Sequence, residues 1–160
     1  MSDNGPVVSN LARSRIGTVT QTYTSEPVSL RHVREYLAGT GADPRKFTGF
    51  DATGTPCPTP PLFFHSACRP IVAEGELLAD GQYSFLGIEG VTGESLAGGN
   101  TFEILAPVFV GDVLHTTETL ISIDERVGRS GPMAITTTLT SYTNQNDEEV
   151  ARYRQVIIFR

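Results

Sequence analysis

The stretch DVLHTTETLISIDERVGRSGPMAITTTLTSYT, residues 112–143, decides the fold class of this chain. Threonine, isoleucine and other residues that favour β-strands are frequent in both of its halves, and further runs of the same kind lie on either side. The strands that we expect are Asn100–Leu105, Asp112–Ile123, Pro132–Thr143 and Val150–Phe159. Because turn-forming residues such as Asn144-Gln145-Asn146-Asp147 separate the long runs, the last third predicts an antiparallel meander.

The first part of the chain shows one strand pattern followed by helical patterns. Ile16–Thr24 is rich in β-branched residues and predicts a strand. Ser29 is a suitable N-cap for a short helix that Gly39-Thr40-Gly41 would end. The apolar positions on one face of this helix are Leu30, Val33, Tyr36 and Leu37. A helical half followed by an antiparallel meander indicates an α+β fold in which the sheet packs on a helix.

Prolines mark the middle of the chain. Thr48–Pro61 is rich in proline and glycine and predicts a loop. The apolar run Leu62–Cys68 follows directly, with Pro61 in a position suited to a first helical turn, so we expect a short buried helix over residues 62–68. Ala73–Gly99 contains glycines without periodicity and predicts an ordered but irregular flap.

Length and charge limit the possible functions. The 160 residues suit one domain, which we expect over residues 16–160 after a flexible tail over residues 1–15. The net charge is −6 and no basic run occurs, which disfavours nucleic acid and membrane surfaces as partners. No apolar stretch approaches the roughly 20 residues that span a bilayer, and the polar N-terminus does not resemble a signal peptide. With only Cys57 and Cys68, we expect reduced thiols in a cytoplasmic protein.

A set of short motifs runs in order through the second half of the chain. The motifs are Ala97-Gly98-Gly99, Phe102, Pro107, Gly111-Asp112, Gly128-Arg129-Ser130-Gly131-Pro132, Gln155 and Arg160. Together they resemble the N-terminal half of the MaoC-like dehydratases, in particular the branch with 3-methylfumaryl-CoA (mesaconyl-CoA) hydratase and mitochondrial 3-hydroxyacyl-thioester dehydratases. The resemblance covers about Ile16 to Arg160 and implies a hot-dog fold, an antiparallel sheet wrapped around a long central helix.

The resemblance also implies an activity. Members of this family add or remove water across the α,β bond of acyl-CoA or acyl-carrier-protein thioesters, and their catalytic domains carry an aspartate and a histidine in a D-x-N-P-x-H string. The nearest match in this chain is Gly41-Ala42-Asp43-Pro44-Arg45-Lys46. Gly41 stands in place of the aspartate and Lys46 in place of the histidine, so this acid–base pair is not carried over.

His65 and Asp43 are the candidates to replace that pair. His65 lies in the apolar segment behind the proline loop, where an imidazole could titrate near neutral pH, although a histidine bonded within the core is the alternative. For Asp43, the alternative is a cap of the turn after the helix. The residues expected to bind the acyl chain are Phe63, Phe64, Gly98, Gly99 and Asn100.

The other histidines, acids and cysteines have no predicted catalytic or metal-binding role. We expect His32 to face solvent, His115 to belong to a cross-strand pair, and Asp51 to have no assigned role. Cys57, His65 and Cys68 have neither zinc-binding spacing nor a fourth ligand. Since no glycine-rich phosphate-binding motif occurs either, the sequence implies no metal and no cofactor.

Three functions stay open. The first is a hydratase or dehydratase of 3-hydroxyacyl or enoyl thioesters. The second is a non-catalytic hot-dog subunit that binds the acyl chain beside a separate catalytic partner. The third is a hot dog repurposed as a thioesterase or a cyclase in a biosynthetic pathway. A single hot dog leaves a sheet edge uncovered, so we expect a homodimer or a heterodimer with a second hot-dog protein.

Overall fold

The computed structural model describes residues 8–77, 79, 81, 83, 88–129 and 131–160. The strands within these residues are β1 (Val19–Thr24), β2 (Ser95–Ile104), β3 (His115–Gly128), β4 (Gly131–Thr143) and β5 (Glu149–Phe159). The helices are α1 (Asn10–Ser14), α2 (Leu30–Gly39) and α3 (Phe63–Ala67), with 3-10 turns η1 (Pro44–Lys46) and η2 (Glu74–Glu76). These elements confirm the α+β class.

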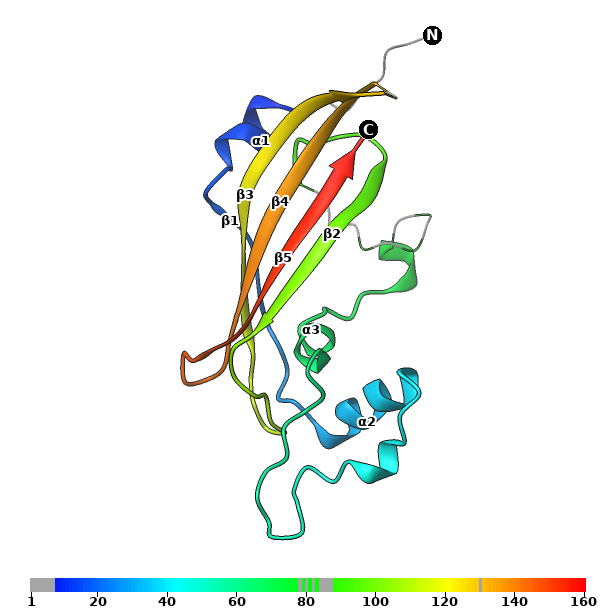
Figure 1. The fold of residues 1–160 in the computed structure, drawn as a ribbon, viewed down its shortest axis with the longest axis vertical. Coiled ribbons are helices and arrows are strands. Elements are labelled where there is room, and N and C mark those ends of the chain that lie inside the picture. Colours follow the sequence, from blue (N-terminus) through cyan, green and yellow to red (C-terminus); the bar gives the residue numbers. More distant parts are fainter. Residues whose placement is uncertain (1–7, 78, 80, 82, 84–87, 130) are drawn as a thin grey trace.

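All five strands form one antiparallel sheet in the order β1-β3-β4-β5-β2. In Figure 1, α2 and α3 lie on the same side of this curved sheet. The predicted meander is confirmed for β3, β4 and β5, which pair in chain order, and β4 and β5 match the predicted strands to within one residue at each end. It is wrong for the strand predicted at Asn100–Leu105, because β2 pairs with β5. The strands β1 and β2 lie at the two edges of the sheet.

The predicted start of β3 is wrong. Asp112 belongs to a turn, because its carboxylate accepts hydrogen bonds from the Phe109 backbone N–H (2.7 Å) and from the Gln145 amide (2.9 Å). The strand therefore begins at His115. At its other end β3 runs on past the predicted Ile123 to Gly128, since it stays paired with β4 throughout.

β2 starts at Ser95 rather than at the predicted Asn100, so the last part of the expected flap is strand. A bulge between Ala97 and Gly99 adjusts its pairing with β5. Gly98 allows this close pairing, because a Cβ there would stand 2.8 Å from Val156 Cγ1. Residues 78, 80, 82 and 84–87 of the expected flap lie outside the described residues. In the part of the chain that is described, no helix is long and apolar enough to cross a membrane.

The N-terminal segment differs from the expected flexible tail. Residues 10–14 form α1, and the Ser9 side chain caps it by accepting a hydrogen bond from the Ala12 backbone N–H (3.1 Å). Ala12 is fully buried and packs against the end of the sheet, because its small side chain lets the helix approach closely. The expected tail is therefore wrong for residues 10–14, and residues 1–7 lie outside the described residues.

Both helices predicted in the first half of the chain are confirmed. Ser29 caps α2 by accepting a hydrogen bond from the His32 backbone N–H (3.0 Å). α3 lies within the predicted residues 62–68, and prolines on both sides limit its length, because a residue before a proline disfavours the helical conformation. The central helix is thus five residues long, not the long helix that the resemblance implies.

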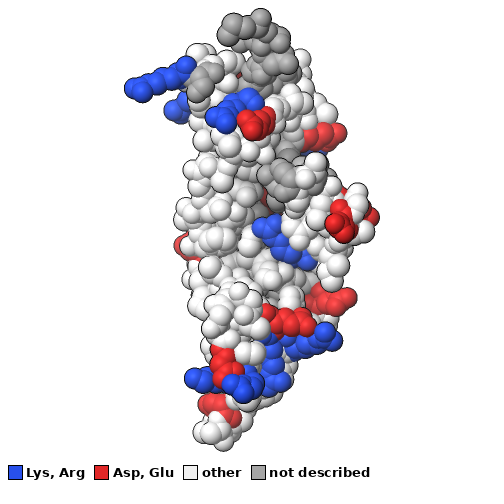
Figure 2. All heavy atoms as spheres, turned by 90° about the vertical axis from the view of Figure 1, so that its right-hand side faces the viewer, with Lys and Arg blue, Asp and Glu red and all other residues white. Residues whose placement is uncertain are grey.

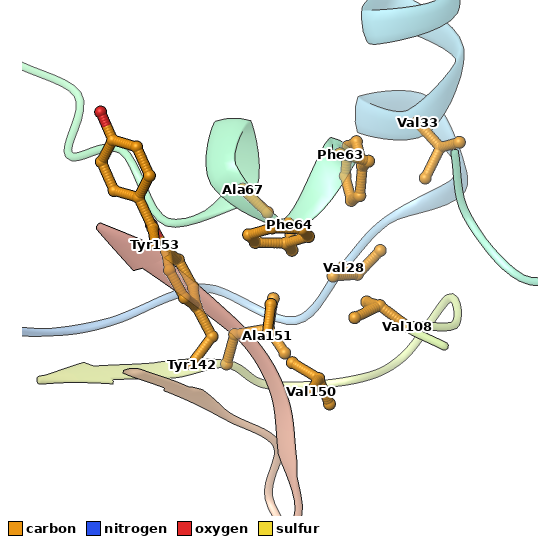
Figure 3. Packing of buried hydrophobic residues seen from close by; sticks show 11 residues of the cluster. Val28, Val33, Phe63, Phe64, Ala67, Val108, Tyr142, Val150, Ala151 and Tyr153 are labelled. Atoms are coloured by element: carbon orange, nitrogen blue, oxygen red, sulfur yellow. The ribbon is translucent and has the colours of Figure 1, made fainter. Parts of the chain in front are cut away.

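The sheet carries two apolar clusters that are separated along its length. The first packs α2 and α3 onto the sheet, and Figure 3 shows Phe64 of α3 over Ala151 of β5 and Phe63 beside Val33 of α2. The second lies under α1 and includes Leu120, Ala134 and Phe159. Register pairs Glu118 with Thr140 and Thr138 with Gln155, and these side chains lie between the two clusters. This polar band of the sheet positions the candidate site.

Candidate functional site

A small polar cavity lies between α3 and the polar band of the sheet. Its volume is about 60 Å³, and its lining includes His65, Arg69, Glu118, Tyr142, Tyr153 and Gln155. We call it the polar cavity. These side chains come from the α3 region and from β3, β4 and β5, so segments far apart in sequence form one site.

His65 is held by hydrogen bonds at both ring nitrogens. Arg69 Nη2 lies 2.8 Å from His65 Nε2, and Tyr142 Oη lies 2.9 Å from His65 Nδ1. A guanidinium only donates, so Nε2 must accept from Arg69 and Nδ1 must carry the proton that is donated to Tyr142. The Tyr142 hydroxyl keeps its own proton to donate elsewhere.

Burial keeps the imidazole neutral. Desolvation, and secondly the positive charge of Arg69, lower the pKa of His65 from 6.5 to about 4. Desolvation also raises the pKa of the Tyr142 phenol above its usual value, and it raises the pKa of the Cys68 thiol to about 12. At neutral pH these three groups are therefore uncharged hydrogen-bonding groups.

We expect acid to destabilise the protein through His65. Between about pH 6.5 and 4 the unfolded chain binds a proton that the folded protein does not, so the free energy of unfolding decreases as the pH falls. The expected loss is about 1–2 kcal/mol, reduced from the full shift because solvent partly screens the half-buried ring. Urea unfolding across this range measures it, with His65→Gln as the control that should have a smaller slope. Equal slopes in both proteins would exclude His65 as the titrating group.

Aromatic rings form one wall of the polar cavity. Phe102 stacks on Tyr153 with ring centroids 4.5 Å apart, and the His65 ring stands edge-on to both. The Tyr153 hydroxyl donates a hydrogen bond to Asn100 Oδ1 at 2.9 Å. Of the residues predicted from sequence, His65 therefore lines the polar cavity. Asn100 contacts the wall of the cavity by its hydrogen bond with Tyr153.

The structure places Asp43 in a different environment. Its carboxylate caps η1 by accepting from the Arg45 backbone N–H (3.0 Å), and it pairs with the Arg45 side chain at 3.0 Å. These bonds with Arg45 hold the pKa of Asp43 below its usual value. Figure 2 shows that charged side chains gather at the end of the molecule where α2 and η1 lie. Asp43 thus acts as a cap and does not line the polar cavity.

The other residues predicted to bind the acyl chain lie in the core or in the backbone of β2. Phe63 is fully buried and meets the rings of His32 and Tyr36 edge-on, with centroids 5.0 and 5.7 Å away. Phe64 packs on Tyr142 with centroids 4.8 Å apart. Gly98 and Gly99 form the bulged backbone of β2.

The other histidines and acids singled out in the sequence have local roles. His115 Nδ1 lies 2.9 Å from Thr24 Oγ1 across the β1–β3 pair, which confirms the cross-strand reading. Asp51 Oδ1 accepts hydrogen bonds from the backbone N–H groups of Thr53 and Thr55 and so holds a tight turn. Cys57 and Cys68 are free thiols.

Sequence reasoning missed most of the polar cavity. Glu118, Tyr142 and Gln155 were not identified as site residues, nor was Arg69. One signal could have indicated Glu118: it alternates with Thr116 and Leu120, which are buried, so a charged residue occupies an inward-facing position of a strand. A half-buried carboxyl group at such a position needs a hydrogen-bond partner or a ligand.

Comparisons with known proteins support this architecture. Residues 14–153 match the model of the family described as FAS1-like, dehydratase domain region. A search of curated protein sequences finds no match. Among solved structures, the ChsH1–ChsH2 complex from Mycobacterium tuberculosis aligns with a TM-score of 0.66 at 11% identity, covering 93% of this chain and 88% of that chain.

Two further structures extend the comparison. Unliganded R-hydratase PhaJ1 from Pseudomonas aeruginosa has a TM-score of 0.59 at 12% identity over 97% of this chain and 87% of that chain. The C-terminally truncated HadBC (3R-hydroxyacyl-ACP dehydratase) complex from Mycobacterium tuberculosis has a TM-score of 0.55 at 19% identity over 86% and 94%. The predicted hot-dog fold is confirmed by these alignments and by the observed sheet.

Proposed function

Because this chain belongs to the family of FAS1-like dehydratase regions, we propose that it is the acyl-binding hot-dog subunit of a hydratase or dehydratase. Its substrates are 3-hydroxyacyl or enoyl thioesters of CoA or of an acyl-carrier protein. A second hot-dog chain supplies the acid–base pair.

One observation carries this proposal. The segment that matches the D-x-N-P-x-H string has Gly41 and Lys46 at the two catalytic positions. Neither residue supplies a carboxylate or an imidazole, and the nearby Asp43 is already engaged with Arg45. Adding water across the α,β bond needs a base that takes a proton from the water attacking the β-carbon and an acid that gives a proton to the α-carbon, and removing water needs the reverse. This segment of the chain offers neither group, which favours a subunit over a self-sufficient enzyme.

The chain's own residues fit a binding role. His65 is bonded at both nitrogens, and its low pKa keeps it neutral, so it orients its neighbours rather than exchanging protons near neutral pH. The Tyr142 hydroxyl retains a proton to donate into the polar cavity. A fixed, uncharged donor of this kind can hold an oxygen atom of a bound acyl group.

The edge strand β2 is a suitable surface for pairing with the second hot-dog chain. β2 is a ten-residue edge strand, and on its outer side the described residues contribute no further strand. Leu96, Ile104 and Leu105 leave apolar surface exposed along or beside it. Such an edge pairs readily with another chain. The solved structures of ChsH1–ChsH2 and HadBC are themselves complexes, which supports pairing here.

We expect this chain to form a one-to-one complex when it is co-expressed with a hot-dog protein that carries the D-x-N-P-x-H string. Light scattering on the purified material measures the mass. Ile104→Lys should weaken the complex, because a lysine on an edge strand opposes pairing. Ile121→Lys on the interior strand β3 is the matched control and should leave the mass unchanged. A chain that stays monomeric alone and with its partner would contradict the proposal.

A second candidate is a hydratase or dehydratase that works without a partner. The observation that favours it is the presence of a carboxylate and an imidazole, Glu118 and His65, in the lining of one cavity. A carboxylate and an imidazole are the two groups that general acid–base catalysis most often uses. Activity of the isolated chain separates this candidate from the first.

A further inference from the structure

The inner face of this sheet is unexpectedly polar where an acyl chain would lie. Glu118, Thr140 and Gln155 line the polar cavity, and Thr138 lies on the same face of β4, two residues from Thr140. Apolar clusters flank this polar band at both ends of the sheet. A hydrocarbon chain placed here would remove water from these polar groups and give them no hydrogen bonds, which is costly.

The Thr138 hydroxyl is an independent sign of a missing polar partner. Thr138 is 5% exposed, and its Oγ1 is a buried atom with no hydrogen-bond partner among the described residues. It is paired in register with Gln155 of β5 and Leu120 of β3, so it lies at the junction of the polar cavity and the second apolar cluster. Buried polar atoms are rarely left unpaired in folded proteins unless a ligand or water satisfies them.

Glu118 can accept more hydrogen bonds than it receives from the described residues. Its Oε1 accepts a hydrogen bond from Thr20 Oγ1 at 2.8 Å, and the described residues provide no side-chain donor for Oε2. A carboxylate only accepts hydrogen bonds, so a ligand group that meets it must carry a proton to donate. A hydroxyl group fits this requirement, whereas a carbonyl or a methylene does not.

The volume of the polar cavity agrees with a small polar group. About 60 Å³ exceeds the roughly 10–15 Å³ that one water molecule needs, so a small hydroxyl-bearing group can enter beside Glu118. The space therefore suits the hydroxylated part of an acyl chain.

We propose that the polar cavity selects acyl thioesters whose acyl chain carries a hydroxyl group beyond the reacting carbons, with that hydroxyl donating to Glu118. This inference rests on the proposed function, because it takes the ligand to be an acyl thioester. It adds the substrate class: hydroxylated rather than plain hydrocarbon acyl groups.

Calorimetry with the full chain, alone and in complex with its hot-dog partner, tests the proposal. The probes are crotonyl-CoA, hexanoyl-CoA, and the 4-, 5- and 6-hydroxyhexanoyl-CoA isomers. At least one hydroxylated isomer should bind about tenfold more tightly than hexanoyl-CoA, the effect of one additional well-placed hydrogen bond. Equal or tighter binding of hexanoyl-CoA would overturn the inference and leave the proposed function standing. Failure of every thioester to bind, crotonyl-CoA included, would instead contradict the proposed function.

Substitutions locate the effect. Glu118→Gln and Thr138→Val should each reduce the preference for the hydroxylated probe to less than about threefold, without weakening hexanoyl-CoA. Thr136→Val is the matched control, because Thr136 lies on the same face and its hydroxyl bonds the Ile157 carbonyl (3.4 Å). It should keep the preference.

A second measurement keeps the proposal falsifiable if Glu118→Gln does not fold. In the ligand-free protein, Thr138→Val should raise the midpoint of thermal unfolding by about 2–4 °C, because it removes an unpaired buried hydroxyl. An unchanged or lower midpoint would show that the hydroxyl is already satisfied. If Thr138→Val kept the full preference for the hydroxylated probe over hexanoyl-CoA, Thr138 would not belong to the binding site. That result would overturn the role proposed for the polar band.

Discussion

Hydration of an enoyl thioester is expected to appear only when this chain is combined with a hot-dog partner that carries the D-x-N-P-x-H string. The rate should exceed that of this chain alone by about 100-fold or more, the usual scale of general acid–base catalysis. The reason is that Gly41 and Lys46 stand where the catalytic aspartate and histidine would be. The decrease in enoyl absorbance of crotonyl-CoA measures the rate.

Variants on both chains assign the chemistry. Replacing the histidine of the partner's string should abolish hydration, whereas Asp43→Asn in this chain should leave it unchanged, because Asp43 only caps η1. Full activity of this chain alone, lost about 100-fold in His65→Ala, would contradict the subunit role. It would assign the reaction to His65 and Glu118 in the polar cavity.

Phe63→Ala should cost about 3–5 kcal/mol of stability, the usual range for removing a buried phenylalanine. Phe63 of α3 is fully buried against α2, where it meets His32 and Tyr36, so its truncation leaves a cavity that the two helices cannot close without moving. Urea unfolding measures the change.

Leu62→Ala is the matched control for this experiment. Leu62 precedes Phe63 but is 42% exposed, so its truncation should change stability by only about 0.5 kcal/mol. If Phe63→Ala kept its stability and lost only thioester binding, Phe63 would contact the acyl chain, as the sequence predicts, and would not be a core residue.

The local elements of this fold follow from local sequence. Runs of β-branched residues predicted β4 and β5 almost to the residue, and the prolines around residues 62–68 predicted the short helix α3. Ser29 and Asp43 act as the caps that their side chains suit. Such features depend on neighbours in the chain, so they can be read without knowing the fold.

Element boundaries depended on contacts that the local sequence does not show. α1 forms where a loose tail was expected because Ala12 packs on the end of a sheet made by residues more than a hundred positions later. β2 begins at Ser95 because Gly98 lets it approach β5 closely. In both cases the distant partner decides whether the segment is regular.

From its motifs alone, the sequence determined the fold class, the family resemblance and the departure at Gly41 and Lys46 from the catalytic string. Only the tertiary structure decided which side chains share the polar cavity. His65, Glu118, Tyr142 and Gln155 meet because strand register aligns them on one face of the sheet and α3 covers that face. Shifting a strand by one residue would turn its side chains to the opposite face, so a site built across strands depends on pairings that no single segment encodes.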